Sequence, residues 1–194
     1  MRRRQFLVGA AGLLLLRDAL AQDRLPPNVR RARPGDKLAA GADAELVFVV
    51  ERDAVLLRRS SSLEVLKNGF RLVTGAALAV FTPGARKTVQ TPTATVGIRG
   101  TAAYFEAERT RTYVCICYGE AVLEPSADPK ARETVRTKHH EQPRYIMASG
   151  APKMVMPAPV INHTDAELIL LEGLVGRRPP FMDSGSTYPT TPGR

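Results

Sequence analysis

The sequence has no tryptophan, only two cysteines, and no hydrophobic run long enough to span a membrane. Aromatic residues make up 6% of its 194 residues. One apolar run, residues 6–16, lies near the N-terminus. It is far shorter than the ~20 residues that cross a bilayer as a helix. No later run reaches that length, so we expect no membrane-spanning helix in the mature chain.

The sequence also lacks the motifs of common enzyme classes. Its serines do not lie in the G-x-S-x-G turn that presents a nucleophile. No glycine-rich phosphate loop follows a predicted strand, and no pair of carboxylates stands apart from ordinary surface charge. The stretch KHHEQP, with His139 and His140 beside Glu141, could suggest a hydrolase, but it is typical of a polar turn. We therefore expect no enzymatic activity and no catalytic residue.

The N-terminal residues have the layout of a cleavable signal peptide. Arg2, Arg3 and Arg4 precede the apolar run, and the residues ALA at 19–21 predict cleavage after Ala21. The stretch RRQFL at 3–7 resembles the twin-arginine export motif, with the general secretion route as the alternative. The expected location is the bacterial periplasm, with residues 1–21 removed and no transmembrane anchor remaining.

The chain is basic, with a formal net charge of +9. Residues 1–21 contribute four arginines and one aspartate, or +3, which leaves +6 for residues 22–194. No basic stripe is interleaved with aromatic residues, so we expect no nucleic-acid partner. A periplasmic protein or a cell-wall polymer is the expected partner, and attraction of the basic face to anionic lipid or polymer is an alternative.

Residues 44–148 predict an all-β domain. Short apolar runs, often β-branched, are separated by glycine, proline or charged residues at the spacing of strands and turns. No helix-length amphipathic pattern interrupts them. The expected fold is a β-sandwich or a short β-solenoid, a jelly-roll-type stack. It is preceded by a flexible lead-in at residues 22–43, which are rich in proline, arginine and glycine.

One helix is predicted in a C-terminal extension, residues 149–180. Thr164 can cap it, and Glu167 completes a capping box. Leu168, Leu171 and Val175 then recur at helical spacing, before glycines that can end the helix. The polar residues 181–194 predict a disordered tail.

The stretch TPTATVGIRGT at 91–101, followed by an alternating strand and by YGEAVL at 118–123, resembles the FecR-domain family. Upstream, GFRLVTGAALAVF fits a further family segment, so that the resemblance covers about residues 45–125. It implies a β-rich periplasmic module, and some family members relay ferric-siderophore signals to a sigma-factor system. The motif positions are Thr91, Pro92, Gly97, Arg99, Gly100, Thr101 and Gly119.

We interpret this motif as a folding device rather than a ligand site. Gly97 and Gly100 allow a bend or close packing, and Arg99 and Thr101 can hydrogen-bond to neighbouring backbone. Signalling members of the family usually carry an internal transmembrane helix and a cytoplasmic segment. Neither is seen in this sequence, so we do not expect direct control of a cytoplasmic sigma factor.

The two cysteines lie one residue apart in the predicted strand TYVCICYGE, residues 112–120. Alternation places Tyr113, Cys115 and Cys117 on one face, and Val114, Ile116 and Tyr118 on the other. Both faces are apolar, so the strand is expected to be covered on both sides. A disulfide between residues two apart on a strand would need a bulge, because their Cβ atoms are roughly 6–7 Å apart.

Three interpretations of the thiols remain open: buried and unreactive cysteines, ligands of a metal or haem, and a disulfide or redox pair. For the metal, Cys115 and Cys117 would be joined by His139, His140 and His163, a set that suits zinc or copper. Adjacent histidines on a strand face opposite sides, so only one of His139 and His140 would reach a given ion without a turn.

The sequence as a whole predicts a soluble periplasmic FecR-domain protein that acts as a non-enzymatic binding or sensing module without a cofactor. A periplasmic metal-binding protein centred on the cysteines is the alternative. A structural envelope protein held by its basic face is a more remote alternative.

Overall fold

A computed structural model of the chain describes residues 25–149 and 153–183. The expected signal peptide and residues 184–194 of the expected disordered tail lie outside these ranges. The elements, in chain order, are β1 (Val29–Arg31), β2 (Lys37–Ala39), β3 (Leu46–Val50), β4 (Asp53–Leu57), β5 (Ser62–Leu66), β6 (Gly69–Val80), β7 (Arg86–Gln90), β8 (Ala94–Ala107), β9 (Arg111–Pro125), η1 (Pro129–Ala131), β10 (Glu133–Thr137), β11 (Arg144–Met147), β12 (Val155–Pro157), α2 (Asp165–Leu174) and η2 (Pro180–Asp183).

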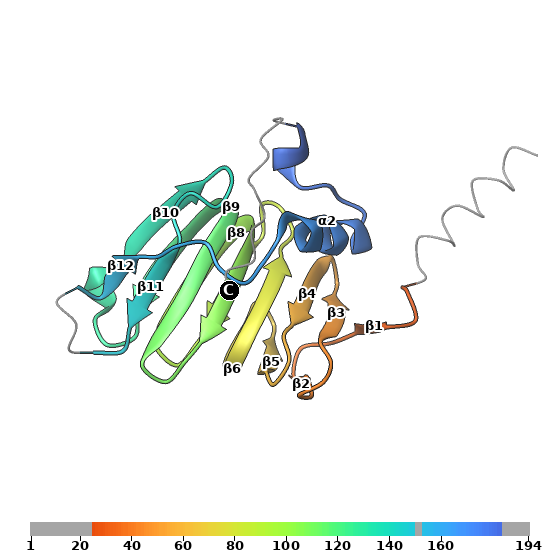
Figure 1. The fold of residues 1–194 in the computed structure, drawn as a ribbon, viewed down its shortest axis with the longest axis horizontal. Coiled ribbons are helices and arrows are strands. Elements are labelled where there is room, and N and C mark those ends of the chain that lie inside the picture. Colours follow the sequence, from red (N-terminus) through yellow and green to blue (C-terminus); the bar gives the residue numbers. More distant parts are fainter. Residues whose placement is uncertain (1–24, 150–152, 184–194) are drawn as a thin grey trace, which may run out of the picture.

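The described strands form one mixed, open sheet (Figure 1). Most neighbours are antiparallel, while β1 pairs with β3 and β6 pairs with β7 in parallel. The single α-helix of the described residues, α2, follows the strands. The predicted fold class, all-β with one C-terminal helix, is therefore confirmed. None of the described helices has the length and apolar character needed to cross a membrane.

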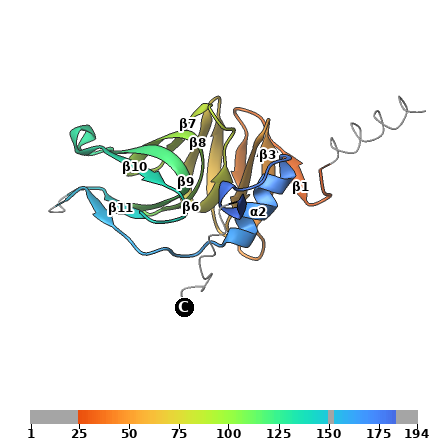
Figure 2. The ribbon, with the colours of Figure 1, turned by 90° about the horizontal axis from the view of Figure 1, so that it is seen from above.

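Three long strands, β6, β8 and β9, bend the sheet into two layers. The first half of β8 pairs with β7, whereas its second half pairs with the end of β6. Likewise β9 pairs with β11 near its start and with β10 near its end. Figure 2 shows the result, with β7, β8 and β10 above β6 and β11. Each long strand thus contributes one half to each layer.

The strands bury side chains on both faces, in two separate apolar clusters. The inner cluster lies between the layers and joins residues of both, including Phe70, Ile98, Phe105 and Ile116. The outer cluster lies on the opposite face of the same strands and includes Leu168 and Leu171 of α2, together with the residues Val49, Ala54, Leu56, Leu78, Val80, Ala102, Tyr104, Tyr113, Cys115, Cys117, Tyr118 and Phe181. The expectation that β9 is covered on both sides is confirmed.

One residue of β9 faces the side opposite to the one predicted. Tyr118 lies in the outer cluster with Cys117, because the pairing of β8 with β9 skips a residue. Ala102 pairs with Tyr118 and Ala103 with Ile116, so Cys117 is the extra residue of a β-bulge. A bulge places two successive side chains on one face. Strict alternation was therefore the wrong assumption at this point of the strand.

Two further expectations are corrected in the terminal segments. The lead-in expected to be flexible contains β1 and β2, which pair with β3 and β5. At the other end, η2 extends the ordered structure to Asp183, and Phe181 within it is buried. The lead-in is held by backbone pairing, and η2 is held by one buried side chain, Phe181. Neither kind of contact leaves a clear hydrophobic periodicity in the sequence.

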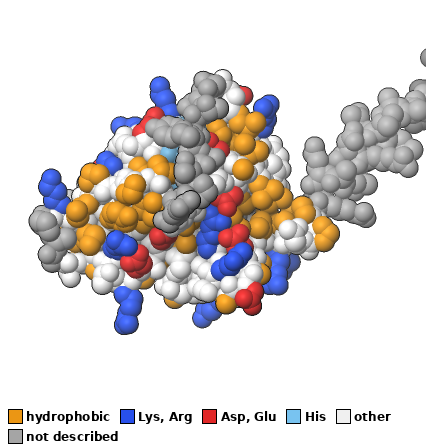
Figure 3. All heavy atoms as spheres, in the orientation of Figure 1, with side chains coloured by type: hydrophobic (Ala, Val, Ile, Leu, Met, Phe, Trp, Pro, Cys, Tyr) orange, Lys and Arg blue, Asp and Glu red, His pale blue; other side chains and the backbone are white. Residues whose placement is uncertain are grey.

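The predicted helix is present with its predicted cap. The Thr164 hydroxyl accepts a hydrogen bond from the Glu167 backbone, and the Glu167 side chain accepts one from the Thr164 backbone. The buried face of α2, with Leu168 and Leu171, packs on β4 and β6. In Figure 1 the chain leaves β12, crosses the front of the sheet and enters α2. We call residues 158–183, which follow β12, the C-terminal arm. The exposed face on this side carries hydrophobic side chains interspersed with charged ones (Figure 3).

Candidate metal centre

Strand β9 places both thiols beneath the C-terminal arm. Cys115 and Cys117 are fully buried in the outer cluster and are free cysteines. The bulge at Cys117 bends the strand where the two thiols lie. The Cys117 thiol also donates to the backbone carbonyl of Cys115, at 3.7 Å. These local contacts hold both sulfur atoms on the side of the sheet that the arm covers.

His140 comes from the bend that follows β10, rather than from a strand. Its backbone has φ +58°, in the left-handed region, and its N–H donates to the Cys117 carbonyl at 3.0 Å. This hydrogen bond fixes the loop against β9. The His140 Nδ1 atom then lies 3.4 Å from Cys115 Sγ. From the sequence, both adjacent histidines could reach one ion only if a turn intervened. A bend at His140 is what brings this histidine to the cysteines.

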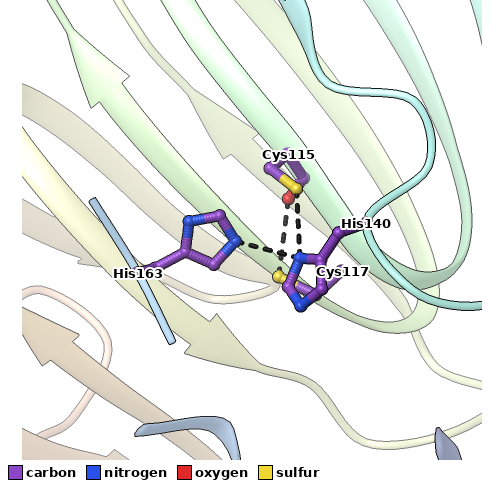
Figure 4. A group of neighbouring side chains, drawn as sticks. All are labelled: Cys115, Cys117, His140 and His163. Atoms are coloured by element: carbon purple, nitrogen blue, oxygen red, sulfur yellow. Dashed lines mark hydrogen bonds between the residues drawn. The ribbon is translucent and has the colours of Figure 1, made fainter. Parts of the chain in front are cut away.

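His163 reaches the same point from the arm, immediately before the cap of α2. Its ring stacks on Tyr104 with centroids 4.7 Å apart. Its Nδ1 atom lies 2.6 Å from the Ile161 carbonyl, and its Nε2 atom lies 3.1 Å from His140 Nδ1. Figure 4 shows the four side chains directed toward one another.

The four donor atoms are grouped closely enough for small side-chain shifts to place them around one metal ion. The two sulfurs and one nitrogen of each of His140 and His163 all lie within 4.8 Å of one another. A tetrahedral zinc site, with Zn–N of about 2.0–2.1 Å and Zn–S of about 2.3 Å, requires ligand atoms about 3.3–3.8 Å apart. The measured 3.1 and 3.4 Å contacts are close to those edges.

Hydrogen bonds on the far side of each ring direct a lone pair into the centre. Because a carbonyl only accepts, Nδ1 of His163 must donate to Ile161, which leaves the lone pair of the neutral ring on Nε2. His140 Nε2 faces the Asp165 carboxylate at 3.1 Å, which in the same way leaves the lone pair of that ring on Nδ1. Two neutral rings would therefore direct lone pairs at each other across 3.1 Å. A proton or a metal ion is needed between them.

The pKa shifts agree with a site that favours charge separation. Burial acts to raise the pKa of Cys115, but hydrogen bonds with Cys117, His140 and His163 outweigh burial and lower it. Burial acts to lower the pKa of His140, but the contacts with Cys115 and Asp165 raise it. Burial raises the pKa of Cys117. A thiolate at Cys115 is the form that binds a metal.

Asp165 and His139 form a second layer behind the ligands. Asp165 is the first residue of α2, and its carboxylate contacts Nε2 of both His139 and His140, at 2.9 and 3.1 Å. The His139 ring stacks on Phe181 of η2, with centroids 4.4 Å apart. His139 does not belong to the group that contains the cysteines. Of the five ligands considered from sequence, the structure brings together Cys115, Cys117, His140 and His163.

Sequence reasoning missed Asp165. An acidic residue in the first turn of a helix is ordinary, because it complements the positive end of the helix dipole. Nothing in the sequence therefore separates this aspartate from a capping residue. Its proximity to His163 along the chain was the one available signal.

None of the FecR-like motif residues belongs to the group of candidate ligands, and Gly100, Gly119 and Thr101 have contacts that fit structural roles. Gly100 and Gly119 have φ of +56° and +96°. A Cβ atom on Gly100 would lie 2.8 Å from the Gly84 backbone nitrogen, and one on Gly119 would lie 2.7 Å from the Thr101 Cβ atom. Thr101 donates to the Ala102 carbonyl at 3.0 Å, as expected. Gly119 therefore allows the close approach of β9 to β8, and Gly100 allows the close approach of β8 to the turn at Pro83 and Gly84.

Of the remaining motif residues, Thr91, Pro92, Gly97 and Arg99, one differs from expectation: Arg99 does not hold a turn. Thr91 closes the turn before β8, since its hydroxyl accepts from the Ala94 backbone at 3.0 Å, and Pro92 is exposed in that turn. A Cβ atom on Gly97 would make only an ordinary van der Waals contact, 3.9 Å from the Val122 carbonyl oxygen, so this position does not require glycine for lack of space. Arg99 lies exposed within β8, and in the described part of the chain no hydrogen bond of its guanidinium fixes a turn.

Comparisons with known proteins relate the chain to others through its fold. No family model matches the chain, and no curated protein matches its sequence. Two crystal structures of a putative anti-sigma factor from Parabacteroides distasonis ATCC 8503 are similar in fold. At 11% and 12% identity they give TM-scores of 0.54 and 0.52, each covering 71% of this chain and 65% of that one. The alignment therefore covers less than two thirds of the length of each neighbouring chain. At this sequence identity the likeness is one of fold alone.

Proposed function

We propose that the chain is a non-enzymatic sensing module that binds one zinc ion through Cys115, Cys117, His140 and His163. The observation that carries the proposal is the arrangement of the two histidines. Each has its outer ring nitrogen bonded to an acceptor, so that the lone pairs of the two rings meet at the centre where the Cys115 thiol also lies. Such partners behind the ligands are typical of histidine at metal sites. Buried, unreactive cysteines would not require this arrangement, whereas a protonated imidazole beside a Cys115 thiolate is the alternative that elemental analysis tests.

Zinc is the ion that fits the donor set best. Two thiolates and two imidazoles in a tetrahedral arrangement are preferred by zinc. All four positions are supplied by protein, and three of the four ligand residues are at most 5% exposed, with His163 at 9%. A closed shell leaves no position for a substrate. This supports a structural or sensing site rather than a catalytic one, and thiolate coordination would protect the cysteines from oxidation.

We further propose that the module acts in the periplasm as a FecR-like protein that contacts a partner protein or a cell-wall polymer. The signal-peptide layout at 1–21 and the resemblance over residues 45–125 support this proposal. The fold shared with proteins described as putative anti-sigma factors, which are regulatory, also supports it. The outer strands of the open sheet offer backbone groups to which a partner strand could be added.

The test of zinc binding is elemental analysis of the full chain, expressed in its native host and purified without chelators. We expect one zinc ion per chain and no reaction of either thiol until the protein is denatured. Replacement of zinc by cobalt should give the visible absorption of a tetrahedral site with thiolate ligands. Copper in place of zinc would correct the identity of the metal and leave the site in place.

The matched pair of variants is His140→Ala and His139→Ala. These neighbouring histidines are both buried and both contact Asp165, but only His140 contacts Cys115. We expect His140→Ala to bind zinc much more weakly, so that it is purified with less than one ion per chain, and His139→Ala to keep one ion per chain. Metal-free protein with two reactive thiols would overturn the proposal, as would equal loss from both variants.

A further inference from the structure

The metal centre is shared between two parts of the chain that can separate. Cys115, Cys117 and His140 belong to the sheet and to the loop that the Cys117 carbonyl fixes. The fourth ligand, His163, belongs to the C-terminal arm, and so does Asp165, which orients His140. The full ligand set therefore exists only while the arm lies on the sheet.

Apart from the centre, the arm is held by few buried apolar groups. Leu168, Leu171 and Phe181 are its buried hydrophobic residues within the described range, and Ala158, Ile161, Leu174 and Val175 pack against the same cluster while only partly buried. Three buried side chains are a modest anchor for a segment of this length, because ordering each residue carries an entropic cost.

Polar contacts also hold the arm to the sheet. Arg58 binds the Glu167 carboxylate and the Asn162 carbonyl, and the Tyr113 hydroxyl donates to the Pro159 carbonyl. The Tyr118 hydroxyl donates to Glu172, which also binds Arg177. Such contacts contribute modestly, because water replaces them when the arm opens.

We propose that metal binding locks the C-terminal arm onto the sheet, so that loss of the ion releases the arm and uncovers the outer apolar cluster. This inference rests on the proposed metal site and names the regulation of that site. With the arm in place the ion has four protein ligands, whereas with the arm open it has three. The ion therefore binds the closed state more tightly, and by linkage it stabilises closure by the same factor.

Release of the C-terminal arm would expose a different surface of the sheet to a binding partner. Leu56, Tyr104 and Tyr113 lie in the outer cluster with the arm residues and are at most 4% exposed. Opening would expose apolar side chains of β4, β8 and β9 while the inner cluster stays packed between the layers. The metal-dependent state of the arm is thus a signal that a binding partner can distinguish.

Hydrogen exchange of the full chain, with zinc bound and after chelation, tests the inference. We expect zinc to slow exchange of the α2 backbone amides by about 10-fold or more, as typical coupling energies between sites give. Amides of β7 and of the first half of β8, which lie in the other layer, should exchange equally in both states. Limited proteolysis should cut the arm only in the chelated protein.

His163→Ala separates this inference from the proposed function. The variant keeps Cys115, Cys117 and His140, so it should still bind zinc, more weakly, but zinc should no longer protect α2. If the wild-type chain binds one zinc ion and exchange of α2 is unchanged, the arm lock is wrong while the metal site stands. If the metal protects all strands and α2 equally, the ion stabilises the whole fold and the lock is again wrong. If no zinc binds, the proposed function itself fails.

Discussion

The inner and outer clusters are built on opposite faces of the same strands, yet they differ in chemistry. The inner cluster consists of Ala, Val, Leu, Ile and Phe side chains. The outer cluster adds three tyrosines and both cysteines, and it lies beneath the arm. Adjacent residues illustrate the difference, since Phe105 faces inward and Tyr104 faces outward, where its ring stacks on His163. The inner face holds the layers together, whereas the outer face carries both packing residues and the candidate metal ligands.

The largest expected effect lies in the inner cluster. Phe105 is fully buried and packs edge-on against Phe70, with centroids 6.0 Å apart. Phe105→Ala should lower the free energy of unfolding by about 3–5 kcal/mol, because it removes a buried aromatic ring and leaves a cavity. Denaturant unfolding measures this loss, and the folded fraction should still bind one metal ion per chain. Loss of the metal from folded protein would contradict the separation of the two clusters.

A smaller effect is expected behind the metal ligands. Asp165→Asn keeps an oxygen acceptor for His140 but removes the negative charge, so metal affinity should fall by about 10–100-fold, as for other partners of metal-ligating histidines. Competition with a chromophoric chelator measures the affinity. Asp183→Asn is the matched control, since Asp183 lies exposed in the same arm. Equal affinities in the two variants would show that Asp165 acts only as an acidic residue of the first helical turn.

The smallest effect is expected at Arg99, which belongs to neither cluster. Its side chain is exposed on β8, so Arg99→Ala should change the free energy of unfolding by less than about 0.5 kcal/mol. The neighbouring Gly100→Ala should cost more, about 1–3 kcal/mol, because alanine is strained at its φ of +56°. Thermal unfolding of both variants gives the comparison. A larger loss for Arg99→Ala would indicate a role for its guanidinium in the fold.

Much of this architecture could be predicted because local patterns determine it. Short β-branched runs predicted the strands, and the capping box of Thr164 and Glu167 predicted the start of α2. The motif predicted a bend or close packing at Gly97 and Gly100, and of these two only Gly100 has a positive φ. The strands β1 and β2 were missed because their order comes from pairing with distant strands. Pairing partners leave no signal in a segment of three residues.

The sequence by itself determined the inventory of the candidate site. It contains two cysteines and three histidines, and the strand period brings the two thiols to one side of β9. Only the tertiary structure decided which histidines join them. The left-handed backbone at His140 turns that ring toward Cys115, while His139 faces Asp165 and Phe181. His163 reaches the same centre because the arm crosses the sheet. A metal site requires donor atoms within a few ångströms of one another, and contacts between segments this far apart in sequence form only when the chain folds.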